Sequence, residues 1–307
     1  MRERMEFVAA WMLLKFLGAL PRRVSRRLAA GIALGIFQIR PVWRRVALFN
    51  LRLAFPDWPE PQRRRVVSRV VRNLGWMAAE SAHFPNFSKQ TIAEAIVLDG
   101  FDNFAAAERR GHGVLFLTGH MGAWELMPFA HALHDKPLHF LVRSIDNARV
   151  DALVNYYRCL SGNRPILKNQ SARAVMQVLR KGGVVGILAD QNTKVEEAVF
   201  ADFFGVPAAT SSGIARLALR TGAAVVPAYG YWDESLEKYR LHYEPELQLT
   251  PTGDEEADIR AYTAKFNQSI ENYIRRFPDQ WLWMHRRWRN RPRGERPLYP
   301  DEIPREG

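Results

Sequence analysis

From residue 113 onward, the order of apolar and polar positions switches repeatedly between the pattern of a strand and that of a helix. Short apolar runs that are typical of buried strands occur at 113–118, 138–142, 184–189 and 224–229. Stretches with helical periodicity lie near 122–133, 148–160, 170–181 and 211–221. This alternation predicts an α/β fold with a mostly parallel central sheet flanked by helices.

The first 85 residues follow a different pattern. Apolar stretches at 7–20 and 28–39 carry aromatic side chains and are flanked by arginine, and 60–83 reads as a long helix with one apolar and one basic face. Both apolar stretches are shorter than the roughly 20 residues that a membrane span needs. The pattern favours helices that lie at a membrane interface and face the cytoplasm. The alternative is that they are ordinary amphipathic packing helices.

Charge is concentrated in the same region. The chain has a formal net charge of +12, and residues 21–72 contain 13 Arg and no Lys against only Asp57 and Glu60, a formal charge of +11. Such a block indicates a polyanionic partner, either an anionic membrane surface or a nucleic acid. Because long apolar stretches interrupt the arginines and no nucleic-acid-binding motif occurs, we expect a membrane surface and no nucleic acid.

Composition excludes several classes of protein. A hydrophobic content of 47% over 307 residues supports a globular core, and the single Cys159 excludes an internal disulfide and a multi-cysteine zinc site. The chain lacks a Gly-x-Ser-x-Gly elbow, a phosphate-binding loop, a complete dinucleotide fingerprint and a His-Glu-x-x-His motif, which argues against serine hydrolases, nucleotide enzymes and zinc proteases. His131, His134 and His139 with Asp135 are better explained as solvated groups near a helix end, so we expect no metal site.

The strongest candidate for chemistry is Gly-His-Met-Gly-Ala-Trp-Glu at 119–125, directly after a buried strand. His120 is expected in a loop and Glu125 in the first turn of a helix, with Gly119 and Gly122 allowing a substrate to approach. A carboxylate at Glu125 would fix the imidazole tautomer and stabilise its protonated form. The alternative is a loop His and a Glu that merely favours the helix dipole.

A second polar group follows another buried strand. Asp190 comes directly after the run at 184–189, and the carboxyl ends of neighbouring parallel strands meet at one edge of a sheet, so we expect Asp190 and His120 to share a site. Asp190 is either a substrate-binding carboxylate or a helix cap. Arg158, near the end of an expected helix, either clamps a phosphate or carboxylate or is a solvated residue.

Four blocks in order give the chain a resemblance to a known family. They are residues 119–126, Ala-Asp-Gln at 189–191 with Phe-Phe-Gly-Val-Pro at 203–207, residues 280–288, and in the N-terminal region Asn-Leu at 50–51 with Ala-Phe-Pro at 54–56 and Asn-Leu-Gly at 73–75 with Glu80. Together the blocks resemble the lipid A biosynthesis (lauroyl/myristoyl) acyltransferases, within the wider lysophospholipid and glycerol-phosphate acyltransferases. The family often has Asn where this chain has Ala123.

The resemblance implies a membrane-associated O-acyltransferase at the cytoplasmic face of the inner membrane. It would move a fatty acyl group from a thioester of acyl carrier protein or coenzyme A, with no other cofactor, to a hydroxyl of a lipid A precursor or related glycolipid. By this resemblance His120 is the general base, Glu125 its partner, and Arg158 and Asp190 belong to the active site. The alternatives are another lipid acceptor, such as a lysophospholipid or a phosphatidylinositol mannoside, and a non-catalytic lipid-binding relative.

Three further expectations complete the interpretation. The chain divides into a membrane-associating helical region at 1–85, an acyltransferase α/β domain at 86–290 and a flexible C-terminal tail at 291–307. Backbone amides in the glycine-rich loop or the following helix start are candidates to stabilise an oxyanion. The aromatic residues Phe200, Phe203 and Phe204 are candidates to line an acyl channel, and the arginines near the C-terminus to bind acceptor phosphates; these are Arg286, Arg287, Arg289, Arg291 and Arg293. The alternatives are plain core and a solvated tail.

Overall fold

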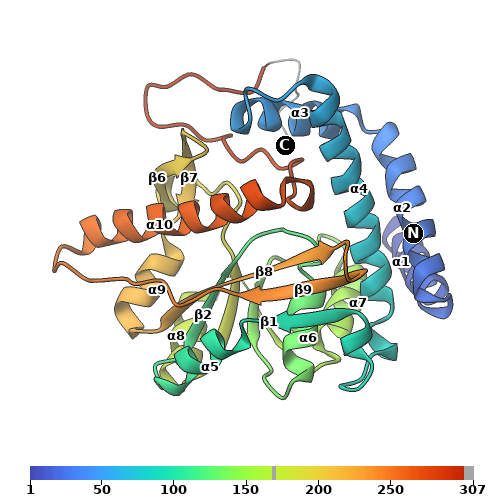
Figure 1. The fold of residues 1–307 in the computed structure, drawn as a ribbon, viewed down its shortest axis with the longest axis horizontal. Helices are drawn as coiled ribbons and strands as arrows, with labels where there is room; N and C mark the ends of the chain where they lie inside the picture. The colour runs from blue at the N-terminus through green and yellow to red at the C-terminus, as the bar shows by residue number, and fades with distance from the viewer. Residues whose placement is uncertain (168–170, 301–307) are drawn as a thin grey trace.

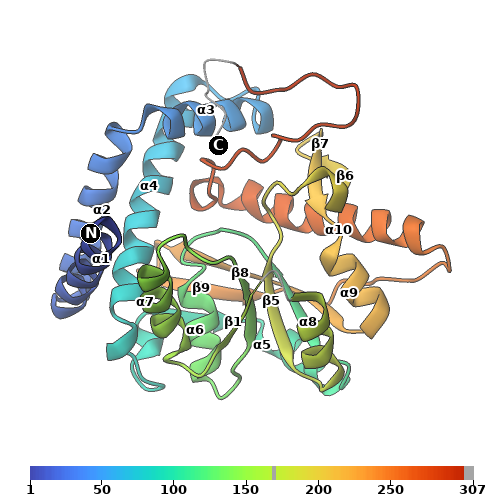
Figure 2. The same cartoon turned by 180° about the vertical axis from the view of Figure 1, so that it is seen from behind.

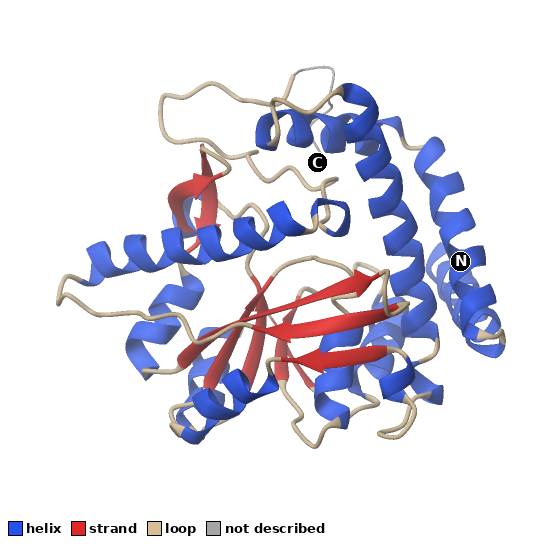
Figure 3. Ribbon diagram, in the orientation of Figure 1, coloured by secondary structure: helices blue, strands red, loops and turns tan. Residues whose placement is uncertain are grey.

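The computed structural model describes residues 1–167 and 171–300 and has a seven-stranded sheet at its centre (Figures 1 and 3). The strand order is β1-β9-β8-β2-β5-β3-β4, and only β8 and β9 pair antiparallel. The strands are β1 (Ile96–Asp99), β2 (Val114–Thr118), β3 (His139–Val142), β4 (Arg164–Leu167), β5 (Val184–Leu188), β8 (Ala224–Asp233) and β9 (Lys238–Tyr243). A separate hairpin joins β6 (Ala198–Phe203) to β7 (Val206–Ser211). The predicted α/β fold with a mostly parallel sheet is confirmed.

Helices cover both faces of this sheet (Figure 2). Because strand residues point alternately to opposite faces, Leu115 and Val225 face one core while Phe116 and Val226 face another. The first, which we call the α10 face, is covered by α8 (Ser171–Arg180), α9 (Gly213–Thr221) and α10 (Glu255–Arg276). The second, the α6 face, is covered by α5 (Phe101–Arg109), α6 (Leu126–Leu133) and α7 (Ala148–Cys159).

The N-terminal region consists of four helices; the first, second and fourth stand beside the sheet, and the third lies above α10 (Figure 1). They are α1 (Arg2–Ala19), α2 (Arg22–Gln38), α3 (Pro41–Ala54) and α4 (Glu60–Ala82). Leu51 of α3 and Val70 of α4 belong to the same buried cluster as Leu115 of the sheet. The region therefore shares its core with the α/β part. No helix within the described residues has the length and apolar content to cross a bilayer.

Much of the arginine block is used inside the protein. Arg22 and Arg26 lie beside the fully buried Glu80, with Arg22 Nε 2.8 Å from Glu80 Oε2 and Arg26 Nη1 3.9 Å from Glu80 Oε1. Arg63 donates to two backbone carbonyls at the end of α3 and the loop that follows. The block thus fastens α2 and α4 to the rest of the chain as well as charging its surface.

The C-terminal segment, residues 277–300, folds back over α3. The Tyr299 hydroxyl donates to Asn50 Oδ1 at 2.8 Å, and the Asn50 amide donates to the carbonyl oxygens of Trp283 and His285. This part of the expected tail, 291–300, is described and includes the packed Tyr299, whereas 301–307 lies outside the described residues.

Short structural elements complete the chain: η1 (Phe84–Asn86), η2 (Ile92–Glu94), η4 (Val195–Glu197) and η5 (Pro278–Gln280). The four strands and the helices expected from residue 113 onward are confirmed, as is the long helix expected at 60–83, although residue 170, at the start of the helix expected near 170–181, lies outside the described part. The sequence patterns did not predict β1, β4, β9, the β6–β7 hairpin, α3, α5 or α10. β1 and β4 are the edge strands of the central sheet, and each of the missed strands is only four to six residues long, which is too short for a clear apolar pattern. In α10 the Asp254 carboxylate caps the first turn by accepting from two backbone amides.

Candidate active site

The loop after β2 is held between the sheet and the C-terminal segment. Met121 forms an isolated antiparallel bridge with Trp281, and the Leu282 amide donates to the His120 carbonyl at 3.1 Å. Gly122 has φ +53°, and a Cβ there would lie 2.6 Å from the Gly230 carbonyl oxygen of β8, so no other residue fits without a shift. A Cβ at Gly119 would press against the Asp190 carboxylate at 3.2 Å.

His120 and Asp190 form the central pair of the site. His120 Nδ1 lies 2.8 Å from Asp190 Oδ1, and the His120 backbone amide donates to Asp190 Oδ2 at 2.8 Å. The Trp281 indole donates to the same Oδ2 at 2.7 Å. The two strand ends lie side by side, as expected from the sequence, because β2 and β5 are paired neighbours. The carboxylate that fixes the imidazole is Asp190; the prediction that Glu125 does so is wrong.

The charge state of this pair follows from its surroundings. Burial alone would raise the pKa of Asp190, but the charge and hydrogen bonds of His120 and the Trp281 indole leave that pKa at about 2. Burial lowers the pKa of His120, yet the charge of Asp190, its hydrogen bond and the charge of Glu125 together raise it above 6.5. Because an ionised carboxylate only accepts, Nδ1 carries the proton and Nε2 is the basic nitrogen.

Glu125 makes its contacts with Arg158. Arg158 Nε and Nη2 donate to the two carboxylate oxygens at 2.7 and 2.5 Å, a bidentate pair in which both side chains are about one-fifth exposed. Burial lowers the pKa of Arg158, but the Glu125 hydrogen bonds and charge raise it overall, so the guanidinium stays charged. Glu125 therefore acts on His120 only through its electric field. Arg158, left as either a clamp or a solvated residue, lies in the site.

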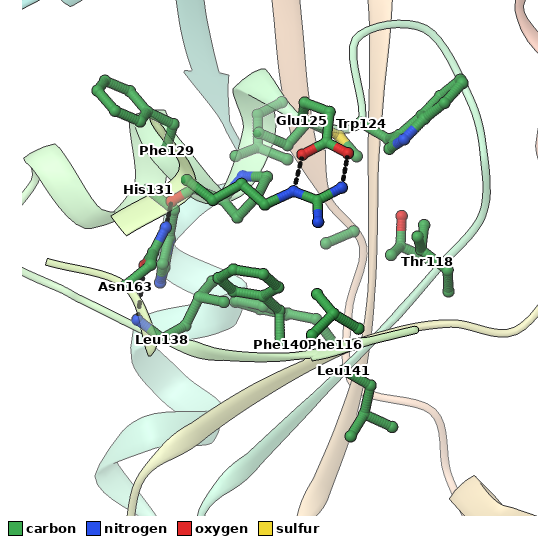
Figure 4. Close-up of a pocket in the computed structure, with 18 of the residues that line it drawn as sticks. Phe116, Thr118, Trp124, Glu125, Phe129, His131, Leu138, Phe140, Leu141 and Asn163 are labelled. Carbon is green, nitrogen blue, oxygen red and sulfur yellow. Dashed lines mark hydrogen bonds and ion pairs between the residues drawn. The ribbon is translucent and has the colours of Figure 1, made fainter. Parts of the chain in front are cut away.

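An apolar pocket of about 100 Å³ begins beside this ion pair on the α6 face (Figure 4). Trp124 and Thr118 lie at one end, while His131 and Asn163 lie at the other (Figure 4). Between them the lining is largely apolar and includes Phe116, Phe129, Leu138, Phe140, Gly186, Leu188 and Ala228. The Trp124 ring also stands edge-on to His120, with 5.2 Å between ring centroids. The pocket therefore opens next to the basic imidazole.

The chain matches the model of a protein family described as "Bacterial lipid A biosynthesis acyltransferase" over residues 3–290. The protein belongs to this family. It is 29% identical over 264 residues to the lipid A biosynthesis palmitoleoyltransferase of Escherichia coli K12, covering 85% of this chain and 84% of that protein. It is 28% identical over 278 residues to the lauroyltransferase of the same organism (90% and 88%) and 25% identical over 284 residues to an acyltransferase of Haemophilus influenzae Rd (92% and 87%). The resemblance is confirmed, and the protein is an acyltransferase.

Some of the residues that were candidates for substrate binding in the acyltransferase lie away from this pocket. Phe203 and Phe204 are buried on the α10 face, where Phe203 packs against Trp281 and Phe204 against Trp283. Neither lines the pocket, so the reading of that aromatic cluster as core is correct for these two. Arg287 is fully buried and donates to Ala209 O, Thr210 Oγ1 and Asn267 Oδ1, so it supports the core and is no phosphate ligand.

Of the histidines near the far end of α6, His131 belongs to the core of the acyltransferase, so the expectation that it is a solvated group is wrong. His131 is 1% exposed, its Nδ1 lies 2.7 Å from the Tyr243 hydroxyl, and burial holds its pKa at about 3. Over the described residues, no group of three or more His, Cys, Asp or Glu side chains is arranged to hold a metal ion.

Three site residues of the acyltransferase were not singled out from the sequence. Trp281 anchors Asp190; His285 accepts from the Asn192 amide at 2.9 Å; and the Gln191 amide nitrogen lies 3.3 Å from His120 Nε2. Burial lowers the pKa of His285 to about 4, so it is neutral. All three fall within the blocks that carry the family resemblance, and this position was the one sign in the sequence that they belong to the site.

Proposed function

We propose that the protein is a membrane-associated O-acyltransferase that moves a fatty acyl group from an acyl thioester to a hydroxyl of a lipid A precursor or a related glycolipid. Membership of the acyltransferase family supports the reaction class. The observation that carries the mechanism is the His120–Asp190 pair at the carboxyl ends of two neighbouring parallel strands, beside an apolar pocket.

In the proposed reaction, His120 acts as general base through Nε2. The acceptor hydroxyl gives its proton to Nε2 as its oxygen attacks the thioester carbonyl carbon. The resulting tetrahedral intermediate expels the thiolate, which takes the proton back from Nε2, giving an ester and a free thiol. Asp190 holds the imidazole with Nδ1 protonated and stabilises the imidazolium that forms.

Glu125 and Arg158 assist from the mouth of the pocket. The negative charge of Glu125 helps to stabilise the imidazolium, which agrees with its part in raising the pKa of His120. Its bidentate bond fixes the guanidinium of Arg158, which can then attract an anionic group of the acceptor or donor. In this proposal Glu125 remains a functional residue, although Asp190 replaces it as the direct partner of His120.

The apolar pocket is proposed to hold the acyl chain. Its lining offers few polar groups beyond those at its two ends, and it starts next to the imidazole, where the thioester carbonyl must lie. Acyl carrier protein and coenzyme A are both candidate donors of the chain.

The experiment is acyl transfer by detergent-purified protein, wild type beside His120→Ala. Donors are acyl carrier protein and coenzyme A thioesters of several chain lengths, and acceptors are a lipid A precursor, lysophospholipids and phosphatidylinositol mannosides. We expect product with the lipid A precursor and a loss of at least about a thousandfold in His120→Ala, because both proton transfers use this group. Full activity in a folded His120→Ala protein would contradict the mechanism, and product only with another acceptor would move the substrate assignment there.

Membrane association is proposed from the surface of the N-terminal helices. On α1, exposed apolar side chains include Met5, Val8, Trp11, Met12, Leu13 and Phe16, and on α2 they include Leu28, Ile32 and Ile36. The two helices lie next to each other outside α4 (Figures 1 and 2). Exposed arginines flank them, among them Arg27 and Arg44. An apolar surface with a basic border suits an anionic bilayer, and we place the active site on its cytoplasmic side.

A vesicle sedimentation assay tests this association. We expect the full chain to bind vesicles containing phosphatidylglycerol, and the double variant Trp11→Glu with Phe16→Glu to bind at least about tenfold more weakly, because charges replace two exposed aromatic side chains that would insert into the bilayer. Val195→Glu, which alters an exposed apolar residue on η4, is the matched control and should bind normally. Equal binding by the double variant would reject this surface as the membrane contact.

A further inference from the structure

The backbone amides of the glycine-rich loop are already engaged. His120 N donates to Asp190 Oδ2, Met121 N to the Gly119 carbonyl at 2.8 Å, and Gly122 N to the Gln280 carbonyl at 2.8 Å. These three amides therefore have no free hydrogen to offer an oxyanion. An acyl transfer through a tetrahedral intermediate nevertheless needs donors where the negative charge develops.

A side-chain donor lies at the position that matters. Gln191 Nε2 is 3.3 Å from His120 Nε2, the nitrogen that must receive the proton because Nδ1 is bonded to Asp190. The nitrogen of a carboxamide only donates, and the neutral imidazole presents a lone pair at Nε2. In this structure the Gln191 amide therefore points at the place that the acceptor hydroxyl must occupy.

The backbone on both sides of Gln191 is fixed. On one side the Asp190 side chain accepts bonds from His120 and Trp281. On the other, the Asn192 amide donates to His285 Nε2 and the Thr193 amide to the Ala209 carbonyl. Gln191 is thus a half-buried side chain on a rigid support, which is what a preorganised catalytic donor requires.

We propose that Gln191 is a catalytic residue: its carboxamide occupies the place of the acceptor hydroxyl in the resting enzyme and donates to the oxyanion during transfer. When the acceptor binds, its hydroxyl displaces the amide from Nε2 to an adjacent position. As the new C–O bond forms, the carbonyl electron pair moves onto oxygen, and the amide N–H donates to it. The pair returns as the C–S bond breaks, and the thiolate takes the proton held on Nε2. This inference rests on the proposed function of His120 as general base.

The test compares Gln191→Glu and Gln191→Met with the wild type in steady-state acyl transfer by the full chain. Both replacements keep the length of the side chain and remove its N–H donor. We expect kcat to fall by about a hundredfold, with KM for donor and acceptor within about twofold, because the hydrogen bond from Gln191 to the oxyanion exists only in the transition state. Gln177→Ala, on the exposed side of α8, is the matched glutamine control and should leave kcat unchanged.

Thermal unfolding of each variant shows whether it is folded, and two different replacements guard against misfolding of one. A folded Gln191→Met protein with kcat within about threefold of the wild type would overturn the proposal, as would a raised KM with normal kcat, which marks a ground-state contact. His120→Ala is measured in the same assay. If it is inactive while both Gln191 variants are fully active, only the role of Gln191 fails; if His120→Ala is active, the general-base mechanism itself fails.

Discussion

The two faces of the central sheet differ in how completely they are filled. On the α10 face, Leu115, Val225 and Tyr229 pack with the indoles of Trp281 and Trp283, all of them at most 1% exposed. On the α6 face, the neighbouring residues of the same strands contribute to the pocket, among them Phe116, Gly186 and Ala228. One face is therefore closed and rigid, and the other leaves room for a ligand.

Residue size on adjacent strand positions explains the difference. Bulky side chains meet indoles on the α10 face, whereas Gly186 and Ala228 place almost no side-chain volume on the α6 face. The site lies where the faces meet, because Asp190 receives one bond from Trp281 of the closed face and two from His120 at the mouth of the pocket. The packed α10 face thus orients His120 and Asp190, which lie at the mouth of the pocket on the α6 face.

The largest effect is expected at this junction. Asp190→Asn keeps the shape of the side chain but no longer favours the Nδ1-protonated tautomer of His120, so kcat should fall by about a thousandfold or more. In the wild type, kcat/KM should increase as pH rises through the pKa of His120, which lies above 6.5, because only the neutral imidazole accepts a proton. In Asp190→Asn the imidazole loses the charge that raises its pKa, so the residual activity should begin to rise at a lower pH than in the wild type. A pH–rate profile of both proteins measures this, and an unchanged profile would contradict the pairing.

The closed face is tested by Arg287→Leu. This change removes the three buried hydrogen bonds that the guanidinium donates to oxygens of Ala209, Thr210 and Asn267, so the free energy of unfolding should fall by about 3 kcal/mol. Activity per folded molecule should change little, since the residue is not at the pocket. Urea denaturation measures the loss. Arg260→Leu, at an exposed arginine of α10, is the control and should lower the free energy of unfolding by less than about 0.5 kcal/mol. Equal losses of stability in the two variants would show that the buried hydrogen bonds of Arg287 do not stabilise the fold.

The Asp190–His120 pair also predicts a pH dependence of stability. The folded pKa of Asp190, about 2, lies below its ordinary 3.8, so the unfolded chain binds more protons between these values. The pair should thus contribute about 2 kcal/mol at pH 5 that is lost as pH falls towards 2. Unfolding of the wild type and Asp190→Asn at both ends of this range provides the measurement. A difference between the two proteins that stays constant with pH would show that Asp190 is not charged in the folded state.

The smallest effect is expected from variants that reduce the volume of the pocket on the α6 face. A Cβ at Gly186 would lie 3.7 Å from Leu138 Cδ1, an ordinary contact, so Gly186→Ala should fold normally and Gly186→Leu should fill part of the pocket. We expect both variants to prefer a shorter acyl chain than the wild type does. The ratio of kcat/KM for a shorter over a longer thioester should rise slightly in Gly186→Ala and by about tenfold in Gly186→Leu, because a few methylene contacts are lost. Competition between thioesters of different length measures the shift. An unchanged preference in Gly186→Leu would place the acyl chain elsewhere.

Local patterns in the sequence were enough to predict the α/β architecture and to place His120 and Asp190 together. Each follows an uninterrupted apolar run, which marks the end of a buried strand regardless of what the strand pairs with. The partner of His120 was assigned wrongly because Glu125 is close in sequence, whereas β2 and β5 are neighbours only in the folded sheet. The order of strands depends on long-range packing that periodicity does not contain.

The pocket and the supporting groups were out of reach for the same reason. Phe140, Gly186 and Ala228 line one cavity but come from three strands, and nothing in the local pattern of each shows that they face each other. Trp281 and His285 belong to a segment without regular helices or long strands, so no hydrophobic periodicity predicts where their side chains lie. Phe203 and Phe204 show the opposite case, in which a conspicuous aromatic run is ordinary core.

The bridge between Met121 and Trp281 has a consequence for how the enzyme is made. A nascent chain that has been synthesised only as far as the end of α10 already contains β2, β5 and both members of the His120–Asp190 pair. The indole that anchors Asp190 and the amide that binds the His120 carbonyl are still to be synthesised. Catalytic competence thus arrives late in translation, after the N-terminal helices have had time to reach the membrane surface that we assign to them.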